Sequence, residues 1–328
     1  MSIHPSLDNQ MLSEEHCFLC GAEANDMTEE HVMPKWLLKS SGLWDKRLTL
    51  LNGTSIPYRL LKVPCCSSCN NEHLSRLEMI IRGAFEEGYS TAIKIDKELW
   101  FLWAAKVIYG ILRKEFSLLA DRSLSGSESI MSEEDIRSFS HLHLFMQSII
   151  GRHKFGDSVP YTVLICKLHD LGEELNFDFR DSLYQKTFLI RVGEVGIIVS
   201  LEDGELIKET FGRYVDEVNG RSLHPLQFDE LYAKVKYQVS LLDSPLRFLT
   251  ISPANGVGEV ITSVIGSQYV SQWNQEDYSR VLELELEPWV KRGVIKKIEF
   301  VPPDKVPSWM VDSLGNILIL NKDDCVSA

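Results

Sequence analysis

Two pairs of cysteines near the start of the chain have the spacing of metal-binding knuckles. Cys17 and Cys20 form one Cys-x-x-Cys pair, and Cys66 and Cys69 form the other. Each knuckle presents two thiolates at once, so the two pairs can supply the four sulfur ligands of one tetrahedral zinc ion. The chain holds seven cysteines, an odd number, and thiols in the cytosol stay reduced. We therefore expect a structural zinc site rather than disulfides.

Cys65 leaves one alternative open for this site. The step from Cys65 to Cys69 is longer than the step from Cys66 to Cys69, and it can also present two thiolates. The shorter step has the same spacing as the first pair, which favours Cys66. Cys166 and Cys325 lie far from both pairs, and we expect them to be ordinary buried or terminal thiols.

A second pattern lies between the knuckles and continues past them. It reads Glu30-His31-x-x-Pro34-Lys35-Trp36-Leu37 and then Cys66-x-x-Cys69-Asn70-Asn71-x-x-x-Ser75-x-Leu77-Glu78. In its order and joint occurrence, this pattern resembles a bacterial branch of the HNH, or ββα-metal, nucleases in which the knuckles are kept. The later step Trp103-x-x-Lys106 also resembles the segment that comes after the motif in that branch.

The resemblance implies a site that hydrolyses phosphodiester bonds of DNA. In the family, a histidine at the place of His31 acts as general base on a water molecule, and an imidazole suits this role because its pKa lies near neutral pH. The carboxylate of Glu30 and the amide oxygen of Asn70 would hold one catalytic cation, Mg²⁺, Mn²⁺ or a similar divalent ion. Successive residues of a strand point to opposite faces, so we expect irregular backbone between Glu30 and His31.

Three further residues have roles that the resemblance leaves open. His73 lies three residues after Asn70, on the same face of a regular helix, and is either a further cation ligand or a packing residue. Many members of the family carry an orienting asparagine before the second knuckle, and Asn52 or, beyond the knuckle, Asn71 can take this role here. Asn52-Gly53 between apolar runs is also a strong signal for a hairpin turn, and we favour the turn for Asn52.

A non-catalytic interpretation competes with the nuclease. Two zinc knuckles with a hairpin and a helix can form a zinc-stabilised module that binds nucleic acid or protein without hydrolysis. Glu29 and Glu30 would then be ordinary carboxylates in the first turn of a helix that Thr28 caps. The adjacent Glu30 and His31, with Asn70 directly after the knuckle, favour the nuclease, and the family implies a setting such as restriction or anti-phage defence.

The charge of the chain bears on its partners. The net charge is −13, which argues against a protein that coats nucleic acid non-specifically, because such binding draws on many Lys and Arg side chains. From Glu29 to Arg82, however, eight Lys and Arg stand against five Asp and Glu. A locally basic segment on an acidic chain would bind DNA weakly alone, so we expect a protein partner or a homo-oligomer. The absence of long apolar runs and of a leader pattern predicts a cytoplasmic protein without membrane contact.

The rest of the chain must supply the elements that position this site, and the expected fold class is α+β. We expect a treble-clef-like ββα-metal module with its four-cysteine zinc site and following helices over 1–120, a linker and helix over 121–158, and an α+β domain for target selection, partner binding or sensing over 159–328. Apolar residues at helical spacing predict helices over 72–87, 96–119, 132–150, 229–242 and 273–292. Shorter periods predict an antiparallel meander over 161–166, 176–179, 187–192, 196–201 and 205–207, and further strands over 247–252, 295–301 and 317–320.

Overall fold

The computed structural model describes most of the chain and divides it into two compact units. The described residues are 13–23, 25–116, 118–124, 127–172, 175–242, 246–251, 256–263, 270–298 and 306–322. Helices and strands are mixed along this range, which confirms the α+β class. The first unit consists of Met1–Glu86, Asp96–Val159 and Phe248–Ser263, and the second consists of Glu87–Ile95, Pro160–Arg247 and Val264–Ala328.

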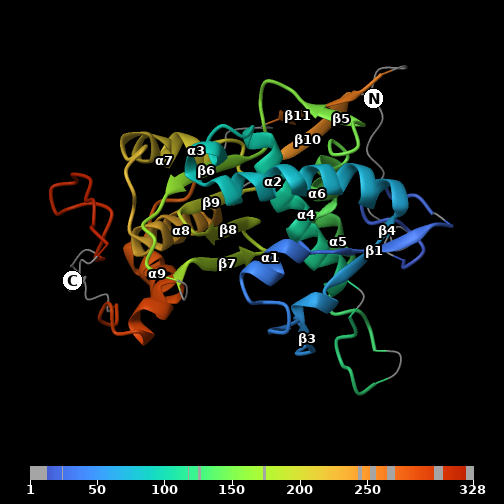
Figure 1. Cartoon of the computed structure of the whole chain (residues 1–328), viewed down its shortest axis with the longest axis horizontal. Helices are drawn as coiled ribbons and strands as arrows, with labels where there is room; N and C mark the ends of the chain where they lie inside the picture. Colours follow the sequence, from blue (N-terminus) through green and yellow to red (C-terminus); the bar gives the residue numbers. More distant parts are fainter. Residues whose placement is uncertain are drawn as a thin grey trace. The chain divides into compact units, whose positions relative to one another are not determined.

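The first unit combines three small sheets with a set of helices (Figure 1). Its strands are β1 (Met27–His31), β2 (Arg47–Thr49), β3 (Ser55–Pro57), β4 (Lys62–Cys66), β5 (His153–Phe155), β10 (Arg247–Ile251) and β11 (Gly258–Ser263). β1 pairs with β4, β2 pairs with β3, and the third sheet has the order β10-β11-β5. Its helical segments are α1 (Lys35–Ser40), the 3-10 turn η1 (Tyr58–Leu60), the π-helical η2 (Cys69–Leu74), α2 (Ser75–Glu87), α4 (Lys97–Glu115), α5 (Glu133–Ser138) and α6 (Ser140–Met146).

Helix α4 forms the centre of the first unit because it is apolar on nearly all of its surface. Asp96 caps its start, and its side chain accepts a hydrogen bond from the backbone N–H of Glu98 at 2.9 Å. Most of the residues after this cap are buried, as expected for a helix without a polar face. Phe85 of α2 packs edge-on against Trp100 and Trp103 of α4, with ring centroids 5.1 and 6.1 Å away. These contacts fix α2 against α4.

The predicted helices of the first unit are confirmed in two cases and corrected in a third. α2 and α4 match the helices expected over 72–87 and 96–119. The helix expected over 132–150 is instead two short helices, α5 and α6, which Phe139 separates with φ −100° and ψ 4°. The ring of Phe139 is buried and lies 6.5 Å from the ring of Phe116, so the burial of this side chain accompanies the break in the helix.

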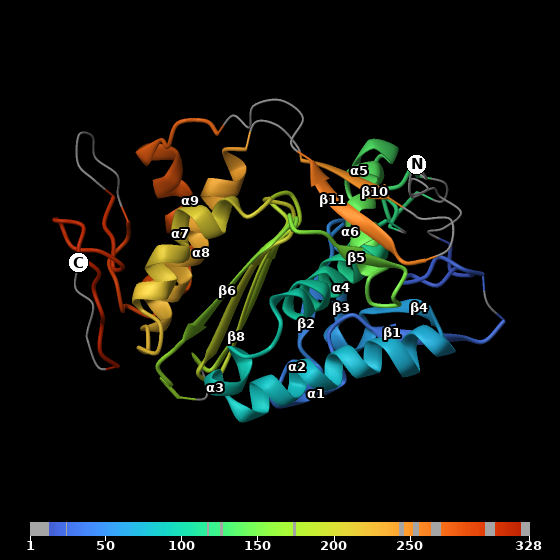
Figure 2. The ribbon, with the colours of Figure 1, turned by 90° about the horizontal axis from the view of Figure 1, so that it is seen from above.

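The second unit is built on a four-stranded antiparallel sheet. Its strands are β6 (Thr162–Lys167), β7 (Phe177–Ser182), β8 (Thr187–Val192) and β9 (Val195–Ser200), and its helices are α3 (Tyr89–Ala92), α7 (Leu206–Glu217), α8 (Pro225–Ser240) and α9 (Gln275–Lys291). The strand order is β6-β9-β8-β7. The predicted meander is therefore correct for β7, β8 and β9, whereas β6 adds at the far side of β9. Helix α8 packs against both the sheet and α9 (Figure 2).

One predicted strand of the second unit is wrong, a second forms no strand in its described part, and a third has only a partial counterpart. Residues 205–207 begin helix α7, in which Phe211, Tyr214 and Val215 recur at helical spacing and pack on the buried core. Three residues are too few to reveal that period. Of the strand expected over 295–301, residues 295–298 form no strand, and residues 299–301 lie outside the described residues. Residues 317–320 contribute a single bridge, between Val311 and Ile317.

No helix in the described part of the chain has the length and apolar character that crossing a membrane requires.

Candidate functional site

The four cysteines that the knuckle spacing singles out come together in space. The sulfur atoms of Cys17, Cys20, Cys66 and Cys69 all lie within 4.8 Å of one another. Four free thiols at these distances form the donor set of a tetrahedral site, so the cluster can hold a metal ion such as zinc. Cys65 stands beside the cluster, with its sulfur 3.9 Å from that of Cys17, and it is Cys66 that joins the converging set.

The first knuckle is fastened to the rest of the unit through its backbone. The N–H of Phe18 donates to the carbonyl oxygen of Pro64 in β4 at 2.9 Å. Gln147 donates to the carbonyl oxygen of Leu19 at 2.6 Å, and Arg152 donates to that of Cys20 at 2.9 Å. The second knuckle is continuous with β4 and η2. The cysteine cluster therefore ties a loop, a strand and the start of a helix together.

Strands β1 and β4 pair regularly throughout. The antiparallel register passes from Glu30 opposite Val63 to His31 opposite Lys62 with no inserted residue. The expected irregular step between Glu30 and His31 is therefore wrong. The ladder even continues beyond the strand, since the N–H of Val32 donates to the carbonyl oxygen of Leu61 at 3.1 Å.

The regular strand sends Glu30 and His31 to opposite faces, and both still border one cavity. Side chains two apart on a strand share a face, so Thr28 and Glu30 face one way while Glu29 and His31 face the other. His31 is the last residue of β1, and side chains from both faces contribute to the cavity at this end. Its volume is about 470 Å³, and its lining comes from β1, α1, η2 and α2: Glu29, Glu30, His31, Lys35, Trp36, Asn70, Asn71, Ser75, Glu78, Met79 and Arg82.

A fully buried lysine of α4 organises the acidic side of the cavity. The ammonium of Lys106 donates to the carbonyl oxygens of His31 and Val32 at 2.7 and 3.1 Å and to Oε1 of Glu78 at 2.8 Å. These bonds use its three protons. Oε1 of Glu30 lies 2.6 Å from the same nitrogen as an ion pair, and it has no hydrogen-bond donor among the described residues. Burial alone would lower the pKa of Lys106, but the carboxylates of Glu30 and Glu78 raise this pKa above its ordinary value.

The surroundings of His31 favour its neutral form. Burial lowers the pKa of this imidazole from its ordinary 6.5, and the positive charges of Lys35 and Lys62 lower it further, against the opposing effect of Glu30. The ring stacks on Trp44 with centroids 6.1 Å apart. A neutral imidazole at neutral pH can accept a proton from a water molecule in the cavity.

The hydrogen bonds of Asn70 determine which end of its amide group is free. The hydroxyl of Thr28 has one proton and donates it to the carbonyl oxygen of Cys65 at 2.8 Å. It must therefore accept from Nδ2 of Asn70, which lies 2.8 Å away. Oδ1 of Asn70 accepts no hydrogen bond from the described residues, and Asn70 lines the cavity. Its amide oxygen can therefore serve as a ligand for a hard cation.

The π-helical segment η2 determines which residues share the face of Asn70. Hydrogen bonds in a π-helix run over five residues rather than four, so Ser75 and then Glu78 of α2 line the cavity together with Asn70. His73 is half-buried and lies outside this lining. Its expected place beside Asn70 assumed the spacing of an α-helix, and the wider turn of η2 moves it off that face.

The two asparagines considered as orienting groups lie in different places. Asn52 occupies the turn between β2 and β3, where its Oδ1 accepts from the N–H of Thr54 at 3.0 Å. The hairpin that the sequence favoured here is confirmed, and Asn52 is not part of the cavity lining. Asn71 does line the cavity, and its amide donates to the hydroxyl of Ser67 at 3.1 Å.

Sequence reasoning assigned no role to Glu78, Lys106 or Arg82, which contribute to the cavity or to its support. Glu78 and Lys106 belonged to the quoted patterns, but nothing local connects either of them to Glu30. One signal could have identified Lys106. A lysine is almost never fully buried unless it is paired, and Lys106 stands in the middle of the apolar run 99–112, so a carboxylate partner was to be expected.

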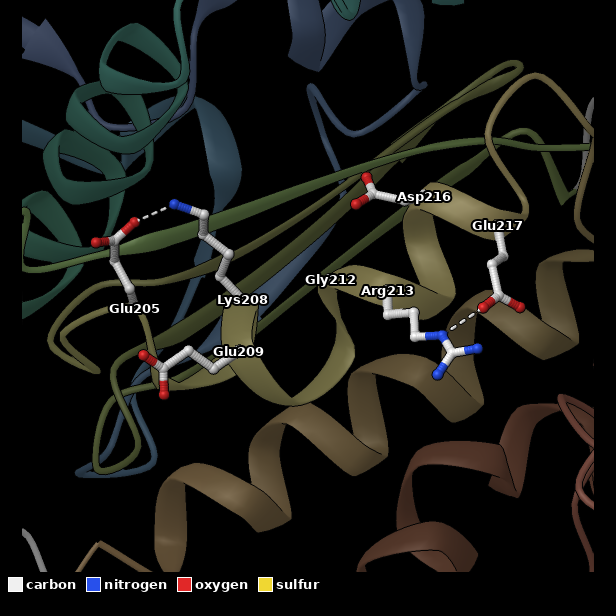
Figure 3. A pocket seen from close by; sticks show the side chains of 7 residues that line it. All are labelled: Glu205, Lys208, Glu209, Gly212, Arg213, Asp216 and Glu217. Atoms are coloured by element: carbon white, nitrogen blue, oxygen red, sulfur yellow. Dashed lines mark hydrogen bonds and ion pairs between the residues drawn. The ribbon is translucent and has the colours of Figure 1, made fainter.

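The second unit has a hollow along one face of α7, lined by Glu205, Lys208, Glu209, Gly212, Arg213, Asp216 and Glu217. Figure 3 shows that Lys208 pairs with Glu205 and that Arg213 pairs with Glu217. Both pairs are one helical turn apart, which is the usual pattern of a solvated helix face. This hollow therefore offers no grouping of side chains that suggests chemistry.

Comparison of the chain with models of known families, with curated proteins and with solved structures finds no match in any of the three.

Proposed function

We propose that the first unit is a metal-dependent endonuclease of the HNH type that hydrolyses phosphodiester bonds of DNA. The observation that carries this proposal is the cavity in which His31, Glu30 and Asn70 meet. The order of elements supports it, because two antiparallel strands, β1 and β4, are followed directly by η2 and α2 with the four-cysteine cluster at their junction. This order agrees with the family that the sequence motifs resemble.

In the proposed reaction, His31 accepts the proton of the water that attacks the scissile phosphate. Its pKa lies below the ordinary value, so the imidazole is ready to act as a base at neutral pH. Glu30 and Oδ1 of Asn70 would hold a divalent cation such as Mg²⁺ or Mn²⁺, since both offer hard oxygen donors. When bound, such a cation stabilises negative charge on the phosphate and on the leaving oxygen. Lys35 and Arg82, which line the same cavity, would attract the phosphate backbone.

A zinc-stabilised binding module without hydrolysis is the alternative, and one observation favours it. The carboxylate of Glu30 already has a cationic partner, because Lys106 lies 2.6 Å from it. A carboxylate that is already neutralised by a buried lysine can have a purely structural role. The cysteine cluster would hold its zinc in either case.

The first experiment compares cleavage of supercoiled plasmid DNA, with Mg²⁺ or Mn²⁺, by three proteins: wild type, His31→Ala and the matched control His169→Ala. His169 belongs to the second unit. Metal analysis first establishes that all three retain zinc. We expect wild type and the control to cut, and His31→Ala to be slower by roughly 10²- to 10⁴-fold, the usual contribution of a general base.

Two outcomes would contradict the proposal. Equal cutting by His31→Ala and wild type would remove His31 from the reaction. Failure of all three zinc-loaded proteins to cut would favour the binding module. The pH profile provides a further check, because His31 must be neutral to act. Cleavage should fall as the pH drops, with a midpoint below 6.5, since the pKa of His31 is lowered from that value.

A further inference from the structure

The cavity contains a second carboxylate that mirrors Glu30. Glu78 projects from α2, lines the same cavity, and gives its Oε1 to the ammonium of Lys106 at 2.8 Å. Glu30 gives its own Oε1 to that nitrogen at 2.6 Å. One buried lysine therefore holds two carboxylates side by side, one from the strand and one from the helix.

The two remaining carboxylate oxygens have no amine, amide or hydroxyl donor among the described residues. The Oε2 atoms of Glu30 and Glu78 accept no hydrogen bond from such groups, both side chains border the cavity, and the two carboxyl groups lie close enough to share a proton. Glu30 is only 7% exposed, so water does little to satisfy its charge. Lys106 provides one positive charge against the two carboxylates, which leaves this corner of the cavity negative.

We propose that Glu78 is a third protein ligand of the divalent cation, and that the cation binds between Glu30, Glu78 and Oδ1 of Asn70. This inference rests on the proposed function for the reaction that the cation serves, but the binding itself can be tested alone. Two carboxylates and one amide oxygen form a donor set for Mg²⁺ or Mn²⁺, with water and phosphate filling the other positions. Lys106 is then a positioning residue, because it orients both carboxylates from behind without touching the cation.

Other properties of Glu78 agree with a shared cation. The Oε1 atoms of Glu30 and Glu78 lie 2.6 and 2.8 Å from Nζ of Lys106, so two acidic groups share a single counter-charge. Two carboxylates this close tend to hold a proton between them, and a divalent cation bound there would take the place of that proton. The positive groups across the cavity are Lys35 and Arg82, both exposed and therefore well screened by water.

The test measures binding of Mn²⁺ to the zinc-loaded full chain by electron paramagnetic resonance, in four proteins. They are wild type, Glu78→Gln, Glu78→Asp and the control Glu86→Gln, which removes an exposed carboxylate of the same helix that pairs with Arg82. Glu78→Gln keeps the shape of the side chain and an oxygen that can accept from Lys106. Thermal unfolding of each variant shows whether it is folded.

We expect Glu78→Gln to weaken Mn²⁺ binding by about 10-fold or more, because even the loss of a group that only supports a ligand costs a metal site 10- to 100-fold. Glu78→Asp should bind more tightly than Glu78→Gln since it keeps the charge. Glu86→Gln should match wild type within about 2-fold, because Glu86 is exposed, does not line the cavity and is screened by salt. A folded Glu78→Gln with the affinity of wild type overturns the inference, and so does a wild type that binds no Mn²⁺ beyond its zinc.

The cleavage assay separates this inference from the proposed function. If Mn²⁺ binding depends on Glu78 but wild type cuts no DNA, the cation site stands and the nuclease proposal fails. If wild type cuts and His31→Ala does not, while Glu78→Gln binds Mn²⁺ normally, the nuclease proposal stands and Glu78 is not a ligand.

Discussion

Replacement of Lys106 by methionine is the perturbation that tests the architecture of the cavity most directly. The ammonium is fully buried and touches two carboxylates and two backbone carbonyl oxygens. Methionine fills a similar volume but leaves both carboxylates without their counter-charge. Removal of one partner from a buried ion pair typically costs about 3–5 kcal/mol. We expect Lys106→Met to lower the free energy of unfolding of the first unit by this amount at pH 8.

The pH dependence of this loss arises from the carboxylates. Without Lys106, the pKa values of Glu30 and Glu78 in the folded state would be raised above those of the unfolded chain, because buried charge is then uncompensated. A folded state that binds more protons than the unfolded state loses stability as the pH rises. The destabilisation should therefore be greatest at pH 8 and should shrink towards pH 5, where the carboxyl groups take up protons.

Hydrogen–deuterium exchange of the amides in α4, followed by mass spectrometry, measures this effect within the first unit. The matched control is Lys97→Met, which makes the same substitution at an exposed position of the same helix and should change stability by no more than about 0.5 kcal/mol. Equal protection of α4 in Lys106→Met and Lys97→Met at pH 8 would refute the reasoning. A loss that grows towards pH 5 would also refute it.

Two further predictions concern packing and metal. Gly110→Ala should lower the melting temperature, at a cost of about 1–3 kcal/mol, because the added Cβ would lie 2.8 Å from Cγ2 of Val32. The control Gly83→Ala in α2 meets nothing within 4 Å and should stabilise the protein by about 0.5–1 kcal/mol. An unchanged or raised melting temperature for Gly110→Ala would contradict the close packing at this position. Cys66→Ser should lose its zinc, as measured by metal analysis, and the first unit should unfold, since structural zinc supplies folding free energy. The control Cys166→Ser should keep its zinc. Full zinc occupancy in Cys66→Ser would exclude Cys66 as a ligand.

The parts of the site that could be predicted are those with short-range signals. Each cysteine pair lies within four residues, and Asn70 follows its knuckle directly, so spacing alone brought these residues to attention. Helix α2 was predictable for the same reason, because its apolar period of three to four residues is visible in a short window.

The parts that escaped prediction depend on contacts between distant segments. The side chain of Lys106 extends from α4 to Glu30 of β1 and Glu78 of α2. A lysine within an apolar run indicates that a carboxylate partner exists, but no local pattern shows which carboxylate it is. The π-helical turn at η2 is a second case, since spacing arguments assume an α-helix and so placed His73 beside Asn70. The expected backbone irregularity after Glu30 was unnecessary, because His31 ends its strand and both faces of the strand are accessible there.

Because the segments of the two units alternate along the sequence, the first unit is completed only late in translation. The first unit is completed by Phe248–Ser263, in which β11 pairs in parallel with β5. A ribosome that stops after residue 159 has made every residue of the cavity but has not made this sheet. We expect such a truncated product to be a poor folding unit and an easy target for proteases. Under the nuclease function proposed above, this arrangement would delay activity until most of the message has been translated.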